Sequence, residues 1–149
     1  MSNNLWDVFE TDVKKELDGV WHEIDLGLGD KNPRFRMGMM SDHNPRYREA
    51  EQKHTLPFAL ILSKKPTNDK EKQRHDQIRD EIRLKTMADG LIYEWENITD
   101  REDKPIEYSF ENAYYLLDNM RHLYDALAIR AAKLDNYRRE KQETESKNS

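Results

Sequence analysis

The stretch that decides the fold is "DREDKPIEYSFENAYYLLDNM", residues 100–120. It begins as a charged turn, continues as a short extended piece with Ile106 and Tyr108 on one face, and then becomes helical. Ser109 stands where an N-cap is expected, because a serine hydroxyl can accept a hydrogen bond from a free backbone N–H at a helix start. The stretch therefore predicts a turn, a short extended segment and a helix that starts at residue 109.

The pattern downstream continues this helix to residue 137. Apolar residues recur on one stripe, at Ala113, Leu116, Leu117, Met120, Leu123, Leu127, Ala131 and Leu134. Asp118 and Asn119 leave open a split into two helices near Met120. After Tyr137 the sequence has no apolar residue, which predicts a disordered polar tail over residues 138–149.

Two further helices are predicted upstream. Asn44 followed by Pro45 is a good cap and first helical residue, which favours a helix over residues 45–54. Apolar residues at helical spacing predict a longer helix over residues 69–97, in which Gly90 costs about 1 kcal/mol relative to alanine and marks a close contact or a kink. Between them, "LPFALIL" is interrupted by Pro57 and is either an edge strand or a short buried helix.

Period-two alternation predicts a β-hairpin over residues 19–40, with turn residues in "GLGDKNP" between its two halves. Two strands alone are only marginally stable, so this hairpin must pack on helices or gain a third strand. The segment before it, residues 5–17, is either a short helix or an irregular arm.

The composition indicates one domain with a small core. The chain has 149 residues, of which 37% are charged and 36% hydrophobic. We expect a single domain over residues 1–137 of the α+β class, mainly α-helical, with the N-terminal hairpin packed on a small bundle of helices.

Several function classes find no support in the sequence. It has no cysteine, no apolar run of the roughly 18 residues that a membrane span needs, and a net charge of -5, which does not favour nucleic-acid binding. Phosphate-binding and nucleophile motifs are absent, and the five histidines show no metal-ligand spacing. We therefore expect no enzymatic activity, no cofactor, no metal and no membrane contact.

The aromatic residues are the best candidates for partner binding. Trp21 lies on the opposite face of the hairpin from Val20, and Trp95 falls on the apolar stripe, where a core position is the simpler interpretation. Tyr114 and Tyr115 point about 100° apart on a helix, so one of them should face outward. Tyrosine is favoured at interfaces because it combines large contact area with a hydroxyl group.

Three stretches in order resemble tail assembly chaperones of long-tailed bacteriophages: "VFETDVKKELDGVWHEI", "RFRMGMMSDHNPRY" and "MADGLIYEWENITDREDKPIEYSFENAYYLLDNMRHLYDALAIRAA". One departure is the turn at residues 102–104, where such proteins often have a glycine. The second stretch adds Arg36 and Tyr47 to the candidate partner-binding residues Trp21, Trp95, Tyr114 and Tyr115.

The resemblance implies a protein of the infected host's cytoplasm that is absent from the mature virion. Its implied partners are the tape-measure protein, which it keeps soluble, and tail-tube subunits, which it recruits; self-association stays open. Two alternatives also remain, namely a structural tail or connector component and a small regulatory protein that binds a host factor.

Overall fold

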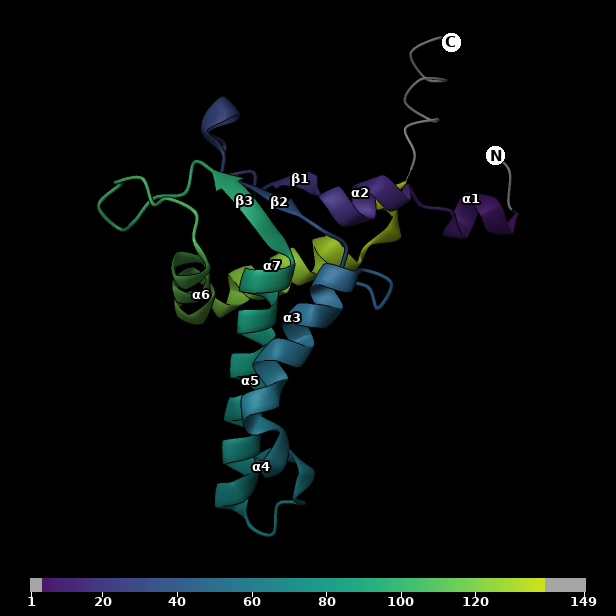
Figure 1. Ribbon diagram of the computed structural model, residues 1–149. Coiled ribbons are helices and arrows are strands. Elements are labelled where there is room, and N and C mark those ends of the chain that lie inside the picture. The colour runs from purple at the N-terminus through teal and green to yellow at the C-terminus, as the bar shows by residue number, and fades with distance from the viewer. Residues whose placement is uncertain (1–3, 139–149) are drawn as a thin grey trace.

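The computed structural model describes residues 4–138 and shows a small sheet with a pair of helices projecting from it (Figure 1). The strands are β1 (Val20–Glu23), β2 (Arg34–Met37) and β3 (Ile92–Glu96), and the helices are α1 (Leu5–Phe9), α2 (Val13–Asp18), α3 (Pro45–Thr55), α4 (Ala59–Ser63), α5 (Asp69–Gly90), α6 (Phe110–Asn119) and α7 (Arg121–Ala132). The predicted α+β class, mainly helical, is confirmed. Of the predicted tail, residues 139–149 lie outside the described residues.

The sheet contains the predicted hairpin and a third strand. β2 is central and pairs antiparallel with β1 and with β3. The predicted helix over residues 69–97 was therefore too long, because α5 ends at Gly90 and Ile92–Glu96 form β3. Cross-strand pairs explain this: Arg34 and Arg36 each form an ion pair with a glutamate of β3, at 2.8 and 3.0 Å.

The predicted helix starts are confirmed by their caps. Asn44 accepts a hydrogen bond from the Arg46 N–H at 3.2 Å and begins α3, and Ser109 accepts one from the Asn112 N–H at 3.0 Å and begins α6. The helix predicted over residues 109–137 is divided, as its alternative allowed, because Met120 adopts φ -129° and ψ 75°. A 3₁₀ turn, Leu134–Tyr137, follows α7.

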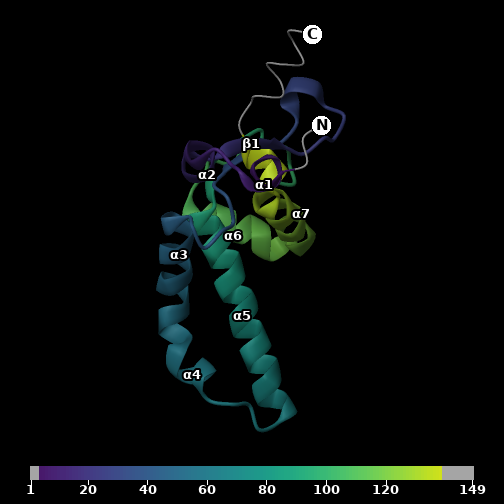
Figure 2. The ribbon, with the colours of Figure 1, turned by 90° about the vertical axis from the view of Figure 1, so that its right-hand side faces the viewer.

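Residues 56–63 differ from both predictions made for them. They form a 3₁₀ turn, Leu56–Phe58, and the short helix α4, and neither is a strand or contains a buried residue. Together they cap the far end of the α3–α5 pair (Figure 2). Pro57 accounts for the interruption, since its ring leaves no N–H for a continued helix.

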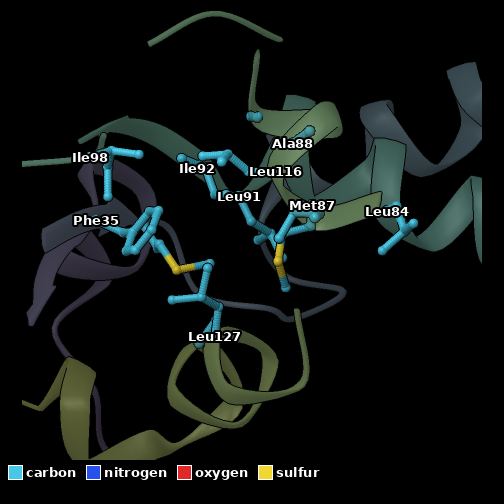
Figure 3. Close-up of a cluster of buried hydrophobic side chains, with 13 residues drawn as sticks. Phe35, Leu84, Met87, Ala88, Leu91, Ile92, Ile98, Leu116 and Leu127 are labelled. Atoms are coloured by element: carbon cyan, nitrogen blue, oxygen red, sulfur yellow. The ribbon is translucent and has the colours of Figure 1, made fainter. Parts of the chain in front are cut away.

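The core lies where the sheet, α5, α6 and α7 meet. Side chains from these elements gather there (Figure 3). It consists of Phe35, Met37, Leu84, Met87, Ala88, Leu91, Ile92, Ile98, Ala113, Leu116, Leu117, Leu127 and Ala131. The part of α5 that projects away from the sheet contributes few of these core residues. Most of the stabilisation from core packing therefore comes from the sheet end of the molecule.

Tyr137 anchors the end of the described chain to the sheet. Its side chain is fully buried, and its hydroxyl lies 3.2 Å from the Met37 carbonyl oxygen, 3.1 Å from that of Gly38 and 3.0 Å from His22 Nε2. Because the hydroxyl donates its one proton to the carbonyls, His22 donates to the hydroxyl as a neutral imidazole. Burial, with a smaller effect from Arg130, lowers the pKa of His22 to about 4. Burial likewise raises the pKa of Tyr137.

Gly90 marks a close contact, which was one of its two predicted meanings. A Cβ atom at this position would lie 2.7 Å from the Ala50 Cβ and 3.1 Å from the Arg46 carbonyl oxygen. We expect Gly90→Ala to lower the free energy of unfolding by about 1–2 kcal/mol, because the clash between α3 and α5 exceeds the gain in helix propensity.

Urea unfolding would measure this change, and the matched control is the same substitution in an Ala50→Gly background. Removal of the Ala50 methyl group relieves the closest contact and leaves the one with the Arg46 carbonyl oxygen, so the two substitutions should be favourably coupled but should not cancel fully. A gain of about 1 kcal/mol for Gly90→Ala alone, as in an open helix, would contradict the predicted clash.

Candidate protein-binding site

A rigid turn over residues 99–105 forms one wall of the candidate site. Thr99 and Pro105 form an isolated antiparallel bridge, and the Asp100 N–H donates to the Lys104 carbonyl oxygen at 2.8 Å. The Asp100 carboxylate accepts hydrogen bonds from the Glu102 and Lys104 N–H groups at 2.8 and 3.0 Å. The loop is therefore held in one shape by its own hydrogen bonds.

Asp103 explains how the turn is made without a glycine. It adopts φ 63°, the left-handed conformation, in which aspartate is tolerated better than most residues. Residues 102–104, which include no glycine, therefore still form a tight turn.

The opposite wall is the C-terminal half of α6. Between the two walls lies a groove of about 510 Å³, lined by Thr99, Asp100, Arg101, Glu102, Ile106, Tyr115, Leu116, Asn119 and Met120. We call this the turn–α6 groove. Its floor is apolar, at Ile106 and Leu116, and its rim is charged at Asp100, Arg101 and Glu102.

Tyr115 is the outward-facing tyrosine of the adjacent pair. It is 54% exposed, and Met120 beside it in the groove lining is 46% exposed. Tyr114 is half-buried: its ring stacks on that of Phe110 at 6.4 Å, and the Lys85 ammonium lies 5.5 Å from its centre. Burial raises the pKa of Tyr114. The pair therefore divides into one structural and one exposed residue.

Trp95 supports the groove from beneath without lining it. Its indole N–H donates to the Ile106 carbonyl oxygen at 2.8 Å, and its ring meets those of Phe35 and Tyr108 edge-on. It thereby fixes the extended segment that carries Ile106 into the groove floor.

The other three candidates lie apart from the groove. The Arg34 guanidinium lies 4.7 Å from the ring centre of half-buried Trp21. Arg36 pairs with Glu94 and also contacts the Asp18 carbonyl oxygen. Tyr47 is half-buried and packs against the core from α3, and burial raises its pKa. Of the six candidates, Tyr115 alone lines the turn–α6 groove.

A family model, the YdaY prophage protein family, matches residues 42–148. This range covers well over half of the chain. The protein belongs to the YdaY prophage protein family. No curated protein and no solved structure matches it.

The matched range contains both walls of the groove but not every element of the fold. It includes α3, α4, α5, β3, α6 and α7, and therefore both walls of the groove in this YdaY-family protein. The elements α1, α2, β1 and β2 precede residue 42.

Sequence reasoning missed the partial exposure of Met120 in this YdaY-family protein. Met120 is predicted to lie on the apolar stripe because its spacing fits a continuous helix. The helix break at this residue turns it toward the groove, and the neighbouring Asp118 and Asn119 were the available signal of that break.

Over residues 4–138, no group of three or more His, Cys, Asp or Glu side chains is placed to hold a metal ion. Within the same range, no helix combines the length and the apolar character of a membrane span.

Proposed function

We propose that this prophage protein is a tail assembly chaperone whose turn–α6 groove binds apolar helical segments of the tape-measure protein. In this proposal it keeps that protein soluble and brings tail-tube subunits to it. The observation that carries the proposal is the groove itself, in which Tyr115 and Met120 lie exposed beside an apolar floor and a charged rim.

The groove has the composition of a protein-binding surface. Interfaces combine an apolar centre with a polar rim and are enriched in tyrosine and methionine. Methionine is flexible and polarizable, which suits a chaperone that must fit several segments of one long partner. An apolar helix would lie with one face on Ile106, Leu116 and Met120, in the manner of helix-in-groove recognition.

The proposal includes a non-enzymatic role in the cytoplasm of the host cell, and departure before the virion is complete. A chain with 37% charged residues carries a well-hydrated surface, which helps a complex with an apolar partner to stay in solution. Contacts through one groove also suit a complex that tail-tube subunits must later displace.

The test is co-expression with the tape-measure protein of the same prophage. We expect the chaperone to raise the soluble tape-measure fraction and to co-purify with it. A Tyr115→Ala, Met120→Ser double variant should reduce the recovered complex by at least about tenfold, since each truncation of a central interface residue costs on the order of 1–2 kcal/mol.

The matched control is Ile129→Ser, which removes an apolar side chain of α7 that is 69% exposed and does not line the groove. It should leave the complex intact. Equal recovery with the double variant would reject the groove as the binding site. No gain in tape-measure solubility, together with the protein's presence in purified virions, would favour a structural tail component instead.

A further inference from the structure

The segment from α1 to the start of α2 exposes an apolar surface that no other part of residues 4–138 covers. We define the arm patch as Leu5, Trp6, Phe9 and Val13, which are 63–74% exposed. α1 has five residues and buries none of them. A helix this short is not stable in water by itself, so its apolar side chains require a covering surface.

The far end of the α3–α5 pair exposes a second apolar surface. We define the tip patch as Leu56, Leu60 and Ile61, which are 75%, 73% and 42% exposed. They belong to the 3₁₀ turn and α4, at the end of the molecule most distant from the sheet (Figure 2).

The charges around the two patches are complementary. Residues 4–13 contain three acidic side chains, Asp7, Glu10 and Asp12, and no lysine or arginine, and Lys14 and Lys15 follow in α2. Residues 54–68 contain two lysines, Lys64 and Lys65, and no acidic residue, whereas Lys53 just before them pairs with Asp89 at 3.3 Å, and Asp69 and Glu71 begin α5 just after them. Opposite charges around apolar centres bring two surfaces together and orient them.

The arm patch of one molecule cannot contact the tip patch of the same molecule. The Asp12 N–H donates to the Tyr137 carbonyl oxygen at 2.8 Å, and Arg138 donates to the Val8 carbonyl oxygen at 2.6 Å, so the arm is held at the sheet end. α5 has 22 residues and is about 33 Å long. The three residues between α1 and α2 span about 10 Å at most.

We propose that the arm patch of one copy docks on the tip patch of a second copy of this chain. Because the two patches lie at opposite ends of the molecule (Figure 1), two antiparallel copies can form both contacts at once, and copies in series form a longer assembly. The turn–α6 groove takes no part in this contact, so the proposal does not depend on the proposed function.

Light scattering over a concentration series of the full chain gives the first test. We expect the mass to rise above that of a monomer and to fall back with Trp6→Asp or Leu60→Asp. Both positions are exposed, so circular dichroism should show unchanged folding. A wild-type chain that stays monomeric throughout the series would overturn the proposal.

Cross-linking gives the sharper test, because the chain has no cysteine. Mixed Phe9→Cys and Ile61→Cys chains should form an intermolecular disulfide between different variants under mild oxidation. The matched control pairs Phe9→Cys with Leu28→Cys, an apolar position on the β1–β2 loop that is 54% exposed. Equal cross-linking in both mixtures would also overturn the proposal.

Charge reversal tests the polar part of the contact. Asp7→Lys should weaken association at low salt, and pairing that variant with a Lys64→Glu chain should restore it. Restored association would identify the acidic arm and the basic tip as partners, whereas no rescue would contradict their pairing.

Discussion

Replacing Tyr137 with alanine should lower the free energy of unfolding by about 3–5 kcal/mol, the range found for removal of large buried aromatic side chains. Tyr137 is fully buried and fills the space between the sheet and the C-terminal segment. Its removal leaves a cavity and also leaves His22 Nε2 without its hydroxyl partner. Urea unfolding followed by far-UV circular dichroism would measure the loss.

Two control variants accompany Tyr137→Ala. One separates the contribution of the ring from that of the hydroxyl group, and the other gives the effect of removing an exposed tyrosine. Tyr137→Phe keeps the ring and removes the hydrogen bonds, so it should cost about 1–3 kcal/mol. Tyr115→Ala removes a tyrosine that is 54% exposed and should change stability by about 0.5 kcal/mol or less. A Tyr137→Ala variant as stable as Tyr115→Ala would refute the role of Tyr137 as an anchor.

Acidification from pH 7 to pH 4 should remove up to about 3 kcal/mol of stability through His22 alone. The folded protein holds the pKa of His22 at about 4, against 6.5 for an unperturbed histidine. Between these values the unfolded chain binds a proton that the folded chain does not. Stability therefore falls as the pH falls through this window, and it is fully retained above pH 6.5.

The control for this prediction is His22→Gln, which can still donate to the Tyr137 hydroxyl but does not titrate. The free energy of unfolding of this variant should change less than that of the wild type between pH 6.5 and pH 4. Identical pH dependence of the two proteins in urea unfolding would show that His22 is not the group responsible.

The parts of the fold that local chemistry determines were predictable. Asn44 and Ser109 mark helix starts because their side chains bond to backbone N–H groups two or three residues away. β3 was not predictable in this way, since Ile92–Glu96 also fits the end of an amphipathic helix. Its partner β2 lies far away in sequence, and pairing with Arg34 and Arg36 decides its conformation.

The candidate site was predictable only in part. Helical spacing indicated that one residue of the Tyr114–Tyr115 pair faces outward, and this is confirmed by the exposure of Tyr115. The groove beside it depends on the turn at residues 99–105 lying opposite α6, which no local pattern contains. Nor does an apolar sequence such as "LPFALIL" reveal whether its side chains are buried, because that depends on what the fold brings against them.

The contacts of residues 137 and 138 affect the order in which the parts of the chain fold. The contacts of Tyr137 with His22 and of Arg138 with Val8 join positions 115 and 130 residues apart in the sequence. Contacts over such separations form late, whereas α3 and α5 are near neighbours and can pair early. During synthesis on the ribosome the helical hairpin can thus form while the sheet end waits for the last of these residues to emerge.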